Sequence, residues 1–202
     1  MEANVDKLIE KIRGYAKKSL KEKRFEHSVR VAQTAAQMCS LYGADEKKGY
    51  LAGIAHDICK SMNDEELLAL AAEDGNPVSE IERSRPALLH GRAAAVLLQK
   101  KFGICDGDVL QAVACHTFGA PDLCPLAKIV YAADKIEPGR PQSTEAYREK
   151  LFSQSLNSLV LSVLRENLGW LKTKGKSIAS SSFEFEKSLG QDSAAEGKNE
   201  CF

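Results

Sequence analysis

The helical spacing of apolar residues constrains the fold of this chain more than any other feature. Near the start, Val5, Leu8, Ile9, Ile12 and Ala16 follow the i, i+3, i+4, i+7, i+11 pattern of an amphipathic helix. No convincing run of alternating β-branched residues, which would indicate a strand, occurs in the sequence. We therefore predict an all-α fold.

Capping and turn residues divide the rest of the chain into further predicted helices. Asp45, Asn63 with Glu66, and Asp106 (or Asp108) are N-terminal capping signals, and Gly103 is a C-terminal one. The predicted helices cover residues 21–42, 45–58, 63–74, 86–102, 106–117, 125–137 and 144–172. After Gly175 the chain becomes polar and rich in serine. We expect a folded domain over residues 1–175 and a mobile tail over 176–202.

Length and charge narrow the class of protein. The 202 residues exceed the length of one average domain of about 150 residues only slightly. Lys and Arg number 28, and so do Asp and Glu, so the net charge disfavours a general nucleic-acid binder. Neither a membrane span nor a signal peptide is visible. The six cysteines form no CxxC motif, and we expect free thiols and a cytoplasmic location.

Histidine and aspartate motifs point to a metal site. The chain has 4 histidines, and His56 is followed directly by Asp57 in the apolar string LAGIAHDICK. Burying these two groups unpaired costs several kcal/mol, and metal ligation would explain them. His27 in RFEHSVRVA and Asp134 in YAADKIEPGRP complete a mixed set that suits Fe, Mn, Co or Zn. The alternatives are a hydrogen-bonded core histidine at position 27 and an ion pair of Asp134 with Lys135.

Five motifs in order resemble one known family. RFEHSVRVA, HDICK, LLHGRAAA, HTFG and ADKIEPGR are similar to motifs of the HD-domain metal phosphohydrolase superfamily. Within it they resemble the bacterial symmetrical bis(5′-nucleosyl)-tetraphosphatases, which hydrolyse diadenosine tetraphosphate to two ADP. The resemblance covers residues 20–172 and implies a compact helical bundle. It also implies that His27, His56, Asp57 and Asp134 bind an iron-type metal, and that His90 and His116 face the phosphates or bind a second metal.

Basic residues near these motifs suit a polyphosphate substrate. Arg24 and Lys60 share helical faces with His27 and His56, Lys135 adjoins Asp134, and Arg140 follows a Pro-Gly turn. Thr117 adds a hydroxyl group next to His116. The implied mechanism is attack on an inner phosphorus by water that the metal activates. Asp57, Lys60, His90 and His116 are the predicted catalytic residues, and Arg24, Lys60, His90, His116, Thr117, Lys135 and Arg140 are the predicted substrate-binding residues.

The C-terminal part departs from the family pattern. Where we expect a Pro and a Thr after the Ile and then an Asn, the chain reads SIASSSFEFEKSL. This departure bears on the end of the domain and leaves the metal centre intact. Two alternatives remain open, namely an HD phosphohydrolase of another nucleotide and a metal-bound nucleotide sensor without turnover. Trp170 is predicted to pack or to contact a second subunit of a homodimer.

Overall fold

The chain folds into helices alone over the residues that the structure describes. The computed structural model describes the backbone of residues 2–199 and the side chains of residues 5–191. Over this range no strand occurs, which confirms the predicted all-α fold. The elements are α1 (Glu2–Ser19), α2 (Glu22–Leu41), α3 (Glu46–Ala55), α4 (Asp64–Ala71), η1 (Ala72–Asp74), α5 (Glu80–Ser84), η2 (Pro86–Leu89), α6 (His90–Phe102), α7 (Gly107–Cys115), α8 (Pro125–Ile136), α9 (Glu145–Phe152), α10 (Leu156–Thr173) and α11 (Ser180–Asn199).

The helices begin where side chains can satisfy the free backbone N–H groups of a first turn. Asp45 caps α3, and Asp106 caps α7, each through its side chain. Asn63 and Glu66 form the predicted capping box of α4. At the other end of α6, Gly103 takes the left-handed conformation that ends a helix. These four predicted boundaries are confirmed.

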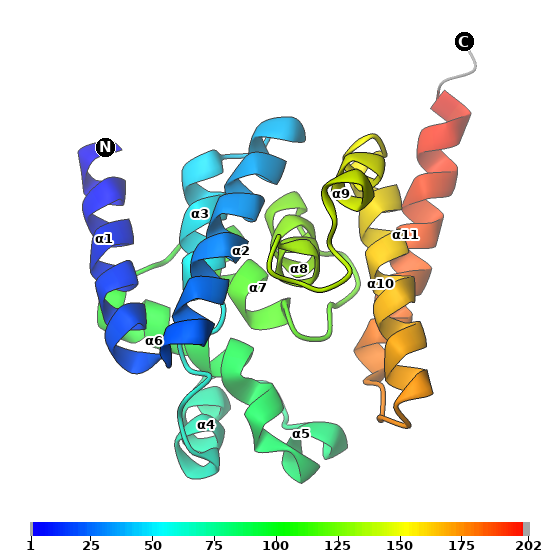
Figure 1. Cartoon of the computed structure of the whole chain (residues 1–202). Coiled ribbons are helices and arrows are strands. Elements are labelled where there is room, and N and C mark those ends of the chain that lie inside the picture. Colours follow the sequence, from blue (N-terminus) through cyan, green and yellow to red (C-terminus); the bar gives the residue numbers. More distant parts are fainter. Residues whose placement is uncertain (1, 200–202) are drawn as a thin grey trace.

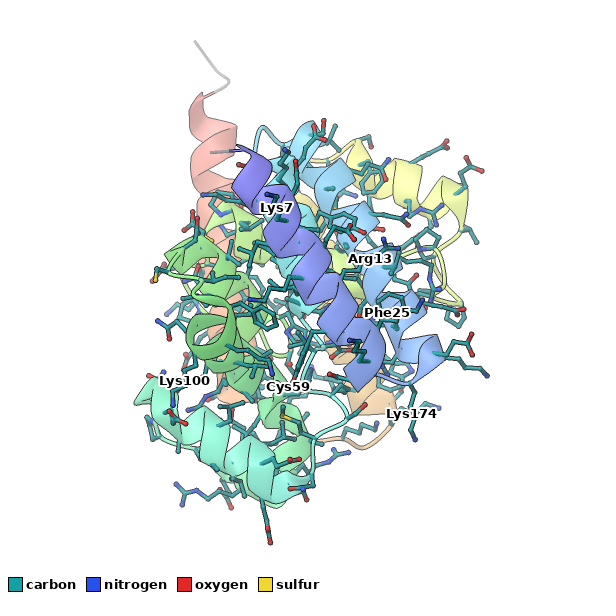
Figure 2. All side chains as sticks on the ribbon, turned by 90° about the vertical axis from the view of Figure 1, so that its left-hand side faces the viewer. Lys7, Arg13, Phe25, Cys59, Lys100 and Lys174 are labelled. Atoms are coloured by element: carbon teal, nitrogen blue, oxygen red, sulfur yellow. The ribbon has the colours of Figure 1, made fainter. Side chains whose placement is uncertain are left out.

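The core lies where α2, α3, α7 and α8 meet (Figure 1). Helix α1 packs on α3 at one side, and Figure 2 shows Lys7 on its outer surface. Helices α10 and α11 run side by side in opposite directions at the other side (Figure 1). Ile12, Met38, Ile54, Tyr131 and Leu159 are among the largest fully buried side chains. They come from five helices, so one core joins the N-terminal and C-terminal parts of the chain.

The structure corrects two expectations about the C-terminal third. The single helix predicted over 144–172 is two helices, because the chain turns after Phe152 and Ser155 caps α10 through its side chain. The mobile tail predicted from residue 176 is instead helix α11 over 180–199, with Phe185 and Leu189 buried in the main core. Two apolar side chains on one helical face anchor this polar segment. Residues 200–202 of the predicted tail lie outside the described residues.

No helix among the described residues combines the length and the apolar character needed to cross a membrane.

Candidate metal centre

The four histidines come from four helices and meet in the interior. His27 lies in α2, His56 directly follows α3, His90 begins α6, and His116 directly follows α7. Each is at most 5% exposed. The ring centres of His27 and His56 are 5.3 Å apart, those of His56 and His116 are 4.8 Å apart, and those of His90 and His116 are 4.9 Å apart. The fold therefore gathers every histidine of the chain into one cluster.

Backbone carbonyl groups orient three of these imidazole rings. Each ring donates from Nδ1 to the carbonyl oxygen three residues earlier, where a helical turn ends. The pairs are His56 with Gly53 at 2.6 Å, His90 with Ala87 at 2.8 Å, and His116 with Val113 at 2.7 Å. A carbonyl oxygen only accepts, so Nδ1 must carry the proton and Nε2 of the neutral ring keeps its lone pair. This is the arrangement that metal-ligating histidines adopt.

Glu137 orients the fourth ring, and sequence reasoning missed it. Its Oε1 accepts from His27 Nδ1 at 3.1 Å, and its Oε2 accepts from Arg30 Nε and from the backbone N–H of Gly139, each at 2.5 Å. Burial favours a raised pKa, but these three donors lower the pKa of Glu137 to about 2. The carboxylate is therefore ionised and holds Nε2 of His27 toward the cluster. The only signal in the sequence is its place in the string ADKIEPGR.

Two carboxylates lie against the Nε2 atoms. Asp57 Oδ1 is 3.0 Å from His90 Nε2, and Asp57 Oδ2 is 3.5 Å from His56 Nε2. Asp134 Oδ1 is 3.1 Å from His27 Nε2 and 3.7 Å from His56 Nε2. Burial works to raise both carboxyl pKa values. The contacts of Asp57 with the His56 and His90 rings, and the Lys135 ammonium group beside Asp134, outweigh burial and hold both carboxyl pKa values well below the ordinary range.

These donors fit a divalent metal ion. The Nε2 atoms of His27 and His56 are buried and make no hydrogen bond in the described part of the chain, a costly state that coordination would relieve. The donor atoms of His27, His56 and Asp134 all lie within 4.8 Å of one another, and so do those of His56, Asp57 and His116. Imidazole and carboxylate donors together suit transition metals. The cluster can therefore hold a divalent metal.

The predicted basic residues surround this cluster. Arg24 donates to Asp57 at 2.9 Å, and Arg140 donates to Asp134 at 2.6 Å. Lys135 Nζ is 3.2 Å from Asp134, and Lys60 Nζ is 3.2 Å from both ring nitrogens of His90. Burial lowers the pKa of Lys60 and of Lys135, and the nearby Asp57 and Asp134 charges offset part of this effect.

A pocket of about 870 Å³ opens onto the cluster. Asp57, His90, His116 and Asp134 line it, while His27 and His56 lie behind them.

The hydroxyl oxygen of Thr117 is 3.4 Å from His116 Nε2. The predicted residues Arg24, Lys60, Thr117, Lys135 and Arg140 also line the pocket. The structure thus brings all the predicted site residues together.

The far wall of the pocket was not foreseen from the sequence. Helices α9 and α10 contribute Tyr147, Glu166, Asn167 and Trp170 to it. Trp170, interpreted from the sequence as a packing or dimer contact, lines the pocket. The predicted homodimer stays a prediction.

The fold and the site together define an all-helical protein with a buried histidine and aspartate metal centre. A family model described as the HD domain matches residues 24–139, the segment that supplies the cluster. The chain is 32% identical over 167 residues to the symmetrical bis(5′-nucleosyl)-tetraphosphatase of Bacillus subtilis, covering 83% of this chain and 89% of the relative. It is 36% identical over 163 residues to the protein of that name from Halalkalibacterium halodurans, covering 80% and 86%.

A solved structure agrees with this similarity. The crystal structure of a predicted HD superfamily hydrolase involved in NAD metabolism, from Clostridium acetobutylicum, superposes with a TM-score of 0.83 at 32% identity. The match covers 91% of this chain and 97% of the other. The chain therefore belongs to the HD-domain family of symmetrical bis(5′-nucleosyl)-tetraphosphatases.

Proposed function

We propose that this chain hydrolyses diadenosine tetraphosphate symmetrically to two ADP with the help of a bound divalent transition metal. One observation carries the proposal. Four imidazole rings and two carboxylates converge at the base of a pocket whose walls hold five basic side chains, four of them beside the cluster. This pairing of a metal centre with a cationic pocket is what hydrolysis of a polyphosphate chain requires. The Bacillus and Halalkalibacterium relatives are named symmetrical bis(5′-nucleosyl)-tetraphosphatases, which supports symmetrical cleavage of a dinucleoside tetraphosphate by this chain.

The ligands we propose are His27, His56, Asp57 and Asp134. Their mix of nitrogen and oxygen donors suits iron, our first choice, with Mn, Co or Zn as alternatives. When bound, such an ion lowers the pKa of a ligated water to about 7 and polarises a phosphoryl oxygen. Glu137 keeps the lone pair of His27 Nε2 directed at the centre.

The basic side chains neutralise the substrate. Arg24, Lys60, Lys135 and Arg140 would bind the phosphoryl oxygens, because a tetraphosphate carries several negative charges that need charge-assisted hydrogen bonds. The Thr117 hydroxyl would donate one further hydrogen bond. These contacts hold the substrate chain in line with the cluster and stabilise charge that develops during cleavage.

The hydrogen bonds of His90 and His116 refine their roles. Nδ1 of each donates to a carbonyl oxygen, so Nε2 of the neutral ring can accept or ligate but cannot donate to a phosphate. Asp57 Oδ1 lies within 3.8 Å of both Nε2 atoms. These contacts support a ligand role for His116 and His90 beside Asp57 when they are neutral, rather than the phosphate-donor role that the sequence analysis allowed.

Product analysis tests the proposed function. Purified protein is assayed on diadenosine tetraphosphate, ATP and NAD with a panel of metals that includes ferrous iron under anaerobic conditions. We expect ADP as the sole nucleotide product from diadenosine tetraphosphate. ATP plus AMP would contradict symmetrical cleavage, and preferred hydrolysis of another nucleotide would favour the first alternative.

A substitution at Asp57 distinguishes an enzyme from a nucleotide sensor without turnover. Asp57→Asn removes a charge at the centre and should abolish turnover and reduce the bound metal. Asp64→Asn, on the exposed first turn of α4, is the matched control and should behave like the wild type. Nucleotide binding without turnover in the wild type across the metal panel would indicate a sensor.

A further inference from the structure

The pocket has two chemically different ends. The end at the metal centre carries the carboxylates and basic side chains described above. The opposite end is formed by one face of α10, whose residues Val163, Glu166, Asn167 and Trp170 follow the i, i+3, i+4, i+7 spacing of a helical stripe. Tyr147 of α9 completes it. The second end therefore offers aromatic and apolar surface with a few polar groups, as small-molecule sites do.

Trp170 is unusual in its exposure. It is 50% exposed, and the other exposed large hydrophobic side chains among the described residues, Leu41 and Phe183, do not line the pocket. Lys176 Nζ lies 5.1 Å from the centre of the Trp170 ring, and Lys176 lines the pocket as well. A large aromatic surface and a cation thus lie side by side on the α10 side of the pocket.

Neighbouring side chains fix this end in place. The Tyr147 hydroxyl donates to Glu166 Oε2 at 2.5 Å, which joins α9 to α10. Val163 of the stripe and the neighbouring Leu164 and Leu168 are buried in the core. The stripe is therefore carried by a helix whose position the core determines, and a ligand would meet a preformed surface.

We propose that this stripe of α10 is a nucleobase subsite and that the indole ring of Trp170 stacks on the base of one nucleoside half of the substrate. The inference rests on the proposed function, because it assigns a binding site to the nucleobase, the part of the substrate that the phosphate-binding residues do not contact. The continuous pocket of about 870 Å³ joins the two ends, and its size lies in the range of sites that enclose small molecules. Stacking requires an accessible aromatic face, and Trp170 provides it.

The fluorescence of Trp170 gives a direct test, because the chain contains 1 tryptophan. The protein is loaded with Zn²⁺ and titrated with ADP and, separately, with inorganic tripolyphosphate, while calorimetry records binding. We expect saturable quenching of the emission with ADP and none with tripolyphosphate. Calorimetric binding of ADP without a change in emission, or the absence of ADP binding, would overturn the inference.

Variants test the contribution of the ring to affinity. Stacking of a base on an aromatic side chain is lost on substitution by alanine, so Trp170→Ala should weaken ADP binding and raise KM for diadenosine tetraphosphate about 5- to 150-fold. Tripolyphosphate binding and kcat should change little. Trp170→Phe keeps an aromatic face and should recover most of the affinity. Phe183→Ala removes a similarly exposed aromatic side chain outside the pocket and is the matched control.

The two proposals fail in different ways. If the wild type cleaves diadenosine tetraphosphate to ADP and Trp170→Ala has an unchanged KM, the subsite is wrong and the function stands. If ADP quenches Trp170 but no metal supports cleavage, the function is wrong and the subsite stands. An equal loss of affinity for ADP and for tripolyphosphate in Trp170→Ala, or dissociation of a wild-type dimer by this variant in sedimentation, would show that the residue acts through the fold or an interface.

Discussion

The lone pair of His27 Nε2 faces the two carboxylates because Glu137 binds the other ring nitrogen. Glu137 is 1% exposed and is shared between His27, Arg30 and the backbone of Gly139. One carboxylate thus couples α2 to the turn after α8. The geometry of the metal centre depends on a residue that would not itself touch the metal.

Glu137→Gln tests this dependence. The amide still accepts from His27, but it loses the charge that strengthens this bond and pairs with Arg30. We expect affinity for the divalent metal to fall about 10- to 100-fold, measured by competition with a chelator. Glu65→Gln, on the exposed first turn of α4, is the control. Unchanged metal affinity in Glu137→Gln would show that the carboxylate does not orient the ring.

The sequence was informative about the clustered histidines and aspartates and much less so about their neighbours. His56, Asp57 and Asp134 stood out because apolar strings seldom contain such groups without a purpose, and the ordered motifs of the family resemblance added His27. Glu137 could not be recognised, because a glutamate at a helix end is common and its three donors lie far away in sequence or in a turn. Such contacts appear only when the chain has folded.

At the scale of elements, capping signals predicted helix starts better than periodicity predicted helix ends. The capping box of Asn63 and Glu66 is local and therefore readable. The turn between α9 and α10 was missed because Leu151 and Leu159 are buried on either side of it, so the apolar pattern continues across the break. Periodicity reports which face is buried and does not report whether the backbone is continuous.

The crossing of α2 and α3 sets the position of His56. A Cβ atom on Gly53 would lie 2.6 Å from Ala32 Cα, and the Gly53 carbonyl oxygen accepts from His56 Nδ1. We expect Gly53→Ala to reduce the free energy of unfolding by about 1–3 kcal/mol and to weaken metal binding. Gly14→Ala in α1 meets nothing within 4 Å and should stabilise the protein by about 0.5–1 kcal/mol. Urea denaturation measures the free energy of unfolding of both variants. Equal effects of the two substitutions would contradict the close crossing of α2 and α3.

An ion pair joins the segment between α4 and α5 to α6 and gives the fold a pH dependence. Arg92 donates to Asp74 at 2.7 and 2.8 Å. Burial works to raise the pKa of Asp74, but Arg92 and the N–H of Asn76 bring it below its ordinary value of 3.8. A carboxyl group with a lowered pKa stabilises the fold above its unfolded-state pKa, and this contribution is lost as the pH falls through the folded-state value.

We therefore expect Asp74→Asn to cost about 1–3 kcal/mol at pH 7, with the difference from the wild type shrinking below about pH 4. Urea denaturation at pH 7 and at pH 3 measures this difference. The exposed Asp122→Asn is the control, since asparagine tolerates the positive φ at this position. A cost for Asp74→Asn that does not depend on pH would contradict the assigned ion pair.

At the scale of the whole molecule, the pocket is built from two parts of the chain. One part supplies the histidine and aspartate cluster, and the other supplies the wall formed by α9 and α10. The histidines and aspartates lie between residues 27 and 134, whereas α9 and α10 follow them. Helix α10 packs on α8, and α11 packs on α10 (Figure 1). The C-terminal helices α9 and α10 thus complete the pocket, and α11 packs along α10.

Phe185 is one of the two side chains, with Leu189, through which α11 reaches the core. It is fully buried, and its ring meets that of Tyr131 at 5.3 Å in an edge-to-face arrangement. Lys135 Nζ lies 3.9 Å from the centre of the same Tyr131 ring, so the packing of α11 extends to a basic residue of the pocket. We expect Phe185→Ala to cost about 3–5 kcal/mol in the free energy of unfolding.

Phe183→Ala, two residues earlier and exposed, should change the free energy of unfolding by less than about 0.5 kcal/mol. Urea denaturation of the full chain compares the two variants. The difference arises because only one of these aromatic side chains leaves a cavity when it is shortened. If Phe185→Ala costs no more than Phe183→Ala, α11 does not pack on the core in solution, and the mobile tail predicted from the polar sequence would be the better description of residues 180–199.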